Sequence, residues 1–236
     1  MPSTYEKNRM PDGGYLMQYK KGPKRVPWSK RALQFKIELV DILPPVWRRI
    51  VVPANYNFWD LHVAIQDAMG WWDSHLHHFE IKGRGAKKEE RIGIPDMEGF
   101  GDGLPEVYPG WEIPVVSRFN DLGITARYLY DYGDCWYHTV MLEGYLLRDN
   151  TINYPLCLGG ARACPPEDCG GIGGYYSLLK TLANPDDREE YEEMKEWVGG
   201  EWDSEKFDKK SVEFSDPYKR WRRAFLEEDE KDHDRT

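Results

Sequence analysis

The sequence predicts an α+β fold, a single domain in which helices pack on a largely antiparallel mixed sheet and the C-terminal part is helical. Strand patterns come first along the chain and helical patterns dominate later, without the alternation of a βαβ architecture. A chain of 236 residues is long enough to bury one good core. We therefore expect one domain, spanning residues 31–228.

The strands are predicted from alternating apolar and polar residues, which place one face of each strand in the core. Five segments carry strand signals: 33–39, 46–52, 75–82, 125–130 and 135–145. Pro44-Pro45 ends the first, since proline cannot donate to a sheet ladder. The stretch Asp131-Tyr132-Gly133-Asp134 has turn composition, so it predicts an antiparallel hairpin between the last two strands.

The helices are predicted from apolar spacing near 3.6 residues and from their ends. Residues 58–69 have this spacing, with Asn57 suited to the N-cap and Asp60 to the positive end of the helix dipole. Gly70 fits the position after the last turn. Further helices are expected at 175–182, 186–198 and about 217–227.

Four stretches have no clear periodicity. Residues 1–30 predict a flexible basic arm and residues 229–236 an acidic disordered tail. Residues 83–111 predict a long irregular insert, and residues 157–174, rich in Gly, Pro and Cys, a loop.

Composition and charge restrict the class of protein. The net charge of −9 argues against a surface that binds nucleic acid all over, because phosphate contacts need clustered Lys and Arg. The aromatic fraction of 14% predicts a dense core and leaves a ligand pocket as the alternative. No apolar run approaches a membrane span and the N-terminus lacks a signal-like segment, so we expect a cytoplasmic protein with no membrane partner and with thiols rather than disulfides.

Three segments concentrate reactive side chains, namely residues 75–78, 131–138 and 164–171. Each has a structural explanation, as a strand, a hairpin turn or a braced loop, which stays open beside a functional one. The cysteine spacing 157, 164 and 169 does not match the paired short spacing of structural zinc sites. There is also no phosphate-binding loop with a Lys and no nucleophile elbow.

Carboxylates and histidine form the remaining candidate chemistry, either for proton transfer or for a divalent cation. The candidate catalytic residues are Asp131, Asp134, His138, Glu167 and Asp168. The candidate metal ligands are Asp131, Asp134, His138 and Glu167, while no cofactor is firmly predicted.

Three strings together resemble a known family: Leu43 to Ile50 (LPPVWRRI), Tyr130 to His138 (YDYGDCWYH) and Pro165 to Gly171 (PPEDCGG) with Tyr175 soon after. They resemble the plasmid pRiA4b ORF-3-like family, also seen as the passenger protein of some bacterial insertion elements. The resemblance covers roughly residues 32–208 and implies a fold and a mobile-element association, but no defined activity. The basic arm and the tail after Asp208 depart from it.

We expect an intracellular binding or interaction module, with a protein or nucleic-acid partner, whose candidate binding residues are Arg48, Arg49 and Trp136. The alternative is a metal-dependent hydrolase, with nucleic acid as one substrate. Either arginine, Arg49 by preference, is expected to pair with a carboxylate of residues 131–134 or 167–168. His138 should share a buried strand face with Trp136 and approach Glu167 or Asp168.

Overall fold

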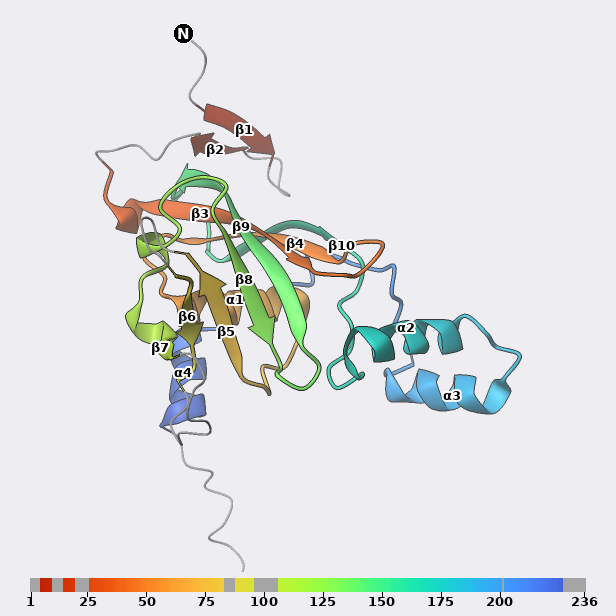
Figure 1. Ribbon diagram of the computed structural model, residues 1–236. Helices are drawn as coiled ribbons and strands as arrows, with labels where there is room; N and C mark the ends of the chain where they lie inside the picture. The colour runs from red at the N-terminus through yellow and green to blue at the C-terminus, as the bar shows by residue number, and fades with distance from the viewer. Residues whose placement is uncertain are drawn as a thin grey trace, which may run out of the picture.

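A single mixed sheet organises the chain. The computed structural model describes residues 5–9, 15–19, 26–82, 88–95, 106–200 and 202–226. Its strands are β1 (Tyr5–Arg9), β2 (Tyr15–Tyr19), β3 (Arg31–Leu39), β4 (Trp47–Pro53), β5 (His77–Ile81), β6 (Glu90–Gly93), β7 (Val107–Pro109), β8 (Thr125–Tyr130), β9 (Trp136–Leu147) and β10 (Leu156–Ala161). Eight of them follow the order β10-β4-β3-β9-β8-β5-β6-β7, and β1 and β2 join beside β9 (Figure 1).

The sheet is largely antiparallel, as expected for the predicted α+β class. Among the pairings of the described strands, only β6 with β7 is parallel. The hairpin of β8 and β9 pairs Tyr130 with Trp136 across the predicted turn. The five predicted strands are confirmed as β3, β4, β5, β8 and β9.

Several segments without clear periodicity contain strands that we did not expect. β6 and β7 lie inside the predicted irregular insert. β10 covers the start of the predicted loop, beginning one residue before it, and pairs with β4. Gly160 looks like a loop residue, but an added Cβ would lie 2.5 Å from Phe207 and 2.7 Å from the Trp47 carbonyl. A glycine is therefore required at this position by close packing against β4 and against Phe207.

The expected arm also holds regular structure. β1 pairs with β2, β2 pairs with β9, and a 3-10 helix, η1 (Trp28–Lys30), precedes β3. The rest of residues 1–25 and the expected tail at 229–236 lie outside the described residues. The flexibility of the arm and the boundaries of the domain stay predictions.

Helix α1 (Phe58–Met69) begins and ends as its sequence predicts. The Asn57 side chain accepts a hydrogen bond from the Asp60 amide, and the Asp60 carboxylate accepts one from the Asn57 amide, which completes a capping box. Gly70 ends the helix with φ of 91°. Ten of its twelve residues are buried, because the helix packs between the sheet and the C-terminal segment.

The C-terminal part is helical, as expected. Helices α2 (Gly171–Leu182) and α3 (Arg188–Trp197) form a pair that projects from one end of the sheet, whereas α4 (Pro217–Phe225) lies near α1 and β7 (Figure 1). Two 3-10 helices, η2 (Gly110–Glu112) and η3 (Val115–Ser117), follow β7. Among the described residues, no helix has the length and apolar character needed to cross a membrane.

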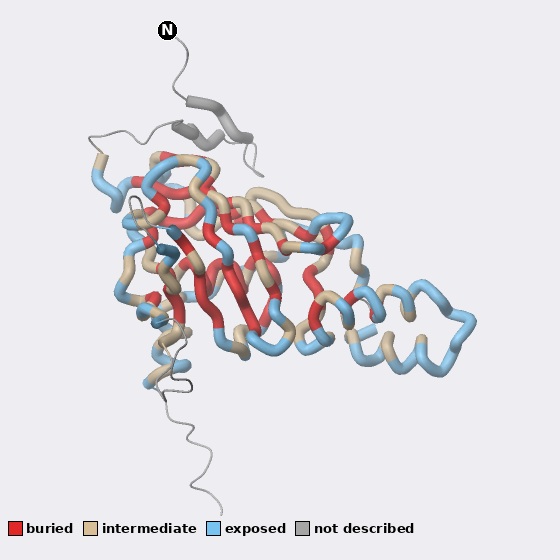
Figure 2. Tube along the Cα trace, in the orientation of Figure 1, coloured by how far each residue is buried: buried red, intermediate tan, exposed pale blue. Residues whose placement is uncertain are grey.

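The main core lies between α1 and the sheet, where buried positions follow the strands (Figure 2). It is rich in aromatic rings: Phe58 packs edge-on against Phe79 at 5.1 Å, and Trp71 stacks on Tyr130 at 4.9 Å. By contrast, α3 buries none of its residues. The dense aromatic core predicted from composition therefore holds the sheet and α1 together, while α3 stays at the periphery.

Candidate functional site

The hairpin turn and the loop before α2 meet, and His75 lies beside both, so all three reactive segments contribute to one junction. The amide of Gly170 donates to Oδ2 of Asp134 at 3.1 Å. The Tyr130 hydroxyl donates a short hydrogen bond to Glu167, and accepts one from the Ser74 amide at 3.0 Å. Burial, and then the Glu167 carboxylate, raise the pKa of Tyr130, so its phenol stays protonated and acts as a donor.

Glycines permit this close approach. A Cβ on Gly171 would lie 2.6 Å from the Asp134 carbonyl oxygen, and one on Gly174 would lie 1.7 Å from the Cys169 carbonyl oxygen. Gly171 also has a φ of 64°. The glycine run at 170–174 therefore brings the loop against the hairpin turn.

One cluster at this junction contains a histidine and two aspartates. Nε2 of His75 lies 3.0 Å from Oδ1 of Asp168 and 3.7 Å from Oδ2 of Asp131. Both aspartates have left-handed backbones, with φ of 60° at Asp131 and 57° at Asp168. Each carboxylate is thus presented from a tight turn, and ligand atoms of the three residues lie within 4.8 Å of one another.

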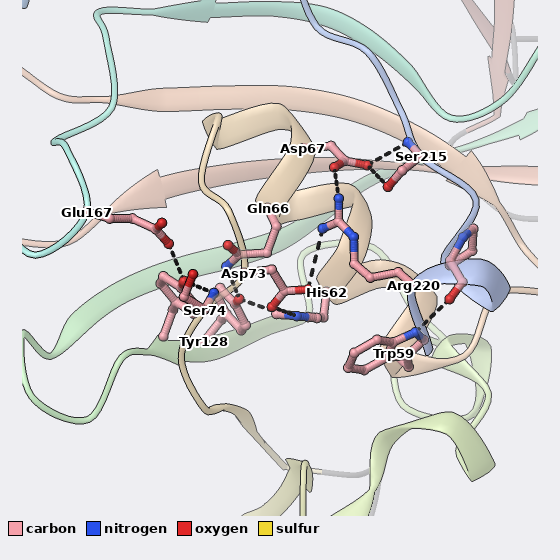
Figure 3. Close-up of polar contacts among 12 residues, drawn as sticks. Trp59, His62, Gln66, Asp67, Asp73, Ser74, Tyr128, Glu167, Ser215 and Arg220 are labelled. Carbon is pink, nitrogen blue, oxygen red and sulfur yellow. Dashed lines mark hydrogen bonds and ion pairs between the residues drawn. The ribbon is translucent and has the colours of Figure 1, made fainter. Parts of the chain in front are cut away.

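A second, buried network joins side chains of α1, Asp73 and β8 (Figure 3). Gln66 donates to the Tyr128 hydroxyl at 2.8 Å, which leaves the hydroxyl proton for Nδ1 of His62, also at 2.8 Å. Nε2 of His62 then carries a proton and donates it to Oδ1 of Asp73 at 2.7 Å. This chain of hydrogen bonds connects α1 to β8.

Helix α4 completes this network. Arg220 reaches Asp67 at 2.6 Å and Asp73 at 3.4 Å, and Ser215 donates to Asp67 through both its amide and its hydroxyl (Figure 3). Trp59 donates from its indole to the carbonyl of Pro217 at 2.9 Å. The C-terminal segment is therefore fastened to α1, and its guanidinium balances two carboxylates that have little exposure.

A cleft of about 890 Å³ opens beside this junction, between the end of α1, residues 163–168 and residues 197–212. Its aromatic lining is Trp71, Trp72, Trp197, Trp202 and Phe207. Its acidic lining is Asp67, Glu167, Asp168, Asp203 and Asp208. The basic residues in the lining are Arg48 and Lys206.

His138 contacts backbone carbonyls rather than its predicted partners, Glu167 and Asp168. It shares the buried face of β9 with Trp136, as expected, but its Nδ1 contacts the carbonyls of Trp136 at 3.1 Å and Tyr128 at 3.3 Å. The predicted approach to Glu167 or Asp168 is wrong, because Glu167 is bound by Tyr130 and Asp168 faces His75. Burial lowers the pKa of His138 to about 4, so the ring is neutral.

The predicted pairing of the two arginines is also wrong. Arg49 binds both carboxylate oxygens of Glu143, at 2.6 and 2.9 Å, across the intervening strand β3. Arg48 is buried, donates to the carbonyls of Trp47, Ala68 and Ala161, and stacks on Phe207 at 3.8 Å. Neither reaches residues 131–134 or 167–168, because adjacent strand residues point to opposite faces and each face offers a nearer acceptor.

The four predicted metal ligands do not converge. Asp131 accepts from the Gly133 amide and Asp134 from the Gly170 amide. Nδ1 of His138 contacts two backbone carbonyls, and Glu167 accepts from the Tyr130 hydroxyl. Trp136, a predicted binding residue, is one of the largest fully buried side chains. Of the residues singled out as candidates, Asp131 and Asp168 share a cluster, and its histidine is His75 rather than His138.

His75 lies in the first reactive segment, but no partner was predicted for its side chain. Its signal was the run His75-Leu76-His77-His78 before a strand. His77 and His78 are buried, whereas His75 precedes β5 and stays partly exposed at the junction.

The cysteines are free thiols, and burial, followed by Asp134, raises the pKa of Cys169 to about 12.

Comparison with known proteins adds a family and two relatives. The family model described as plasmid pRiA4b ORF-3-like protein matches residues 31–211. The uncharacterized protein y4hQ of Sinorhizobium fredii is 35% identical over 184 residues, covering 78% of this chain and 87% of that one. The crystal structure of MM3350, a protein of unknown function from Methanosarcina mazei Go1, is similar with a TM-score of 0.68 and 38% identity, covering 78% of this chain and 98% of that one.

Proposed function

The chain belongs to the plasmid pRiA4b ORF-3-like protein family, and because the names of its relatives state no activity, we propose a function from the cleft itself. We propose that this protein is an intracellular binding module whose cleft holds a cationic segment of a protein partner, such as a run containing Lys or Arg. The observation that carries the proposal is the combination of aromatic and acidic side chains in one lining.

The charge of the lining favours a cation. Five carboxylates line the cleft, and one of them, Asp67, is paired with Arg220. The other four lie opposite Lys206, because the second basic residue of the lining, Arg48, is buried beneath Phe207 with its donors on carbonyls. Asp203 and Asp208 are exposed, so their charges face the opening. A cleft lined by one sign of charge concentrates ligands of the opposite sign.

The aromatic lining favours a cation carried on an organic side chain. Trp72 is 84% exposed and Trp197 is 50% exposed, although indole rings usually bury most of their surface. Exposed aromatic rings beside a cleft are typical of interaction sites, and an indole face attracts ammonium and guanidinium groups. The two tryptophans give the ligand both contact area and a favourable electrostatic surface.

The same electrostatics argue against nucleic acid in this cleft, because phosphates would meet the carboxylates. The alternative function, a metal-dependent hydrolase, has no convergent ligand set in Asp131, Asp134, His138 and Glu167. A protein partner is therefore the class of ligand that the lining supports best.

Calorimetric titration of the full chain with short Lys- and Arg-rich peptides tests the proposal. We expect saturable binding that weakens with salt. Trp72→Ala should weaken binding by about tenfold or more, as expected for an aromatic anchor. Asp203→Asn with Asp208→Asn should also weaken it, because asparagine keeps the turn acceptor at Oδ1 and removes the charge.

Matched controls separate the cleft from general surface effects. Trp28→Ala removes an exposed tryptophan outside the cleft, and Asp186→Asn with Asp187→Asn removes two exposed charges outside it. Both controls should bind like the parent chain. Equal weakening in the controls, or tighter binding of an oligonucleotide that competes with the peptide, would refute the proposed function.

A further inference from the structure

We propose that His75, Asp131 and Asp168 form a binding site for a divalent transition-metal ion of the zinc class. The site does not depend on the proposed peptide binding, although Asp168 also lines the cleft and so places the metal at its edge. The three ligands come from the residues before β5, from the β8–β9 turn and from the loop before α2.

The separations fit metal ligands. Two ligand atoms that each lie about 2.1 Å from a tetrahedral zinc ion are about 3.4 Å apart. Nε2 of His75 is 3.0 Å from Asp168 Oδ1 and 3.7 Å from Asp131 Oδ2, which bracket that value. Small side-chain adjustments would bring all three atoms to one ion.

The ligand atoms lack the hydrogen bonds that would otherwise explain their positions. Nε2 of His75 is buried and makes no hydrogen bond among the described residues, because the nearby carboxylate oxygens lie outside hydrogen-bond geometry. Asp131 is only 7% exposed; Oδ1 accepts from the Gly133 amide, while Oδ2 faces His75 with no hydrogen bond from the described residues. Buried polar atoms are normally paired, so the unpaired Nε2 of His75, which lies close to two carboxylates, points to a ligand.

The surroundings hold the ligands in place. The Asp131 carboxylate is fixed by its turn, and the Tyr130 ring packs edge-on against the His75 ring at 5.8 Å. Tyr130 is itself anchored to Ser74 and Glu167. A ligand set supported in this way loses less entropy when the ion binds.

The cluster is open on one side. The Asp168 side chain is 71% exposed, so an ion can enter from solvent and keep a water ligand in addition to the three protein ligands. One imidazole with two carboxylates suits zinc or manganese better than magnesium, which prefers oxygen ligands alone.

The buried group of His62, Asp73 and His77 is a weaker candidate. His62 and Asp73 already form a hydrogen bond of 2.7 Å, and Arg220 neutralises Asp73. The rings of His62 and His77 are nearly parallel, so their lone pairs do not converge on one point. This group is explained without an ion.

Isothermal titration of metal-free full chain with zinc chloride, and then manganese chloride, tests the site. We expect one ion per chain, with zinc bound more tightly than manganese. His75→Gln, Asp131→Asn and Asp168→Asn should each weaken zinc binding by more than about tenfold. Asp131→Asn retains the Oδ1 acceptor for Gly133, and Asp168 is exposed, so at least these two variants should fold.

Trp72→Ala is the control, since it removes the proposed peptide anchor and should leave zinc affinity unchanged. Conversely, His75→Gln should leave peptide binding intact, so failure of one proposal is distinguishable from failure of the other. No saturable binding at millimolar zinc would overturn the site. So would zinc affinity that stays the same in His75→Gln and Asp168→Asn, because the ion would then lie elsewhere.

Discussion

The imidazole rings of His62 and His77 lie face to face, with centroids 3.4 Å apart and 6° between their planes. His62 comes from α1 and His77 from β5, so the stack joins the helix to the sheet. Both rings are buried, and Nδ1 of His77 has no hydrogen-bond partner among the described residues. Burial, and then His62 and His78, lower the pKa of His77 well below 6.5. The stack is therefore built around a neutral His77.

This arrangement predicts loss of stability in mild acid. His77 and His138 both have folded-state pKa values below the unfolded value of 6.5, so the unfolded chain takes up protons first as the pH falls. The stability that the two neutral histidines contribute is fully present above pH 6.5. For His138 it is lost as the pH falls from 6.5 to its folded-state pKa of about 4. Each histidine adds a slope of about 1.4 kcal/mol per pH unit. Urea unfolding at several pH values between neutral and mildly acidic measures this slope of the unfolding free energy.

His77→Phe keeps an aromatic ring beside His62 and removes the titrating group. We expect a shallower dependence of unfolding free energy on pH in this variant than in the parent chain. Identical slopes for the two proteins would show that His77 is not buried in its neutral form.

The neighbouring residues Arg48 and Arg49 should respond differently to the same substitution. Arg48→Lys removes donors from buried carbonyls and should cost about 3 kcal/mol or more. Arg49→Lys keeps a charge beside Glu143 at a partly exposed position and should cost less than about 1 kcal/mol. Chemical denaturation of both variants gives the comparison; equal costs would contradict the assigned environments.

Adjacent glycines in α2 provide a second matched pair. Gly174→Ala would place a Cβ against the Cys169 carbonyl and should destabilise the chain by more than about 2 kcal/mol. Gly173→Ala meets nothing within 4 Å and should be neutral or stabilising by up to about 1 kcal/mol. Because Gly174 packs the loop that carries Asp168, its variant should also bind zinc less tightly, whereas Gly173→Ala should not. Thermal unfolding and calorimetry test the two effects.

Local patterns determined much of the fold. The capping box of Asn57 and Asp60 and the left-handed Gly70 define α1 at both ends, since they act on backbone groups within one helical turn. The composition of residues 131–134 predicted the hairpin, and alternation predicted the buried face of Trp136 and His138. Such features depend on neighbours in sequence, so the sequence is sufficient to find them.

The sequence patterns did not predict the strands that are stabilised by partners distant in the chain. β10 contains glycines and little alternation, and it is a strand because β4 offers its backbone groups beside it. β6 and β7 are short; β6 pairs with β5 on one side and with β7 on the other. Their strand character comes from pairing rather than from intrinsic preference.

The candidate site was predicted in its residue types but not in its contacts. Asp131 and Asp168 were named from sequence, while His75 joined them only because the glycine-dependent turn and loop close against the start of β5. Arg49 pairs with Glu143 because of the register of three strands, β4, β3 and β9, which local sequence patterns do not predict. The sequence by itself determined which elements form and which side chains can carry charge or bind metal. Tertiary packing decided which of them meet, because contacts between distant segments depend on register and on approach distances of a few ångströms.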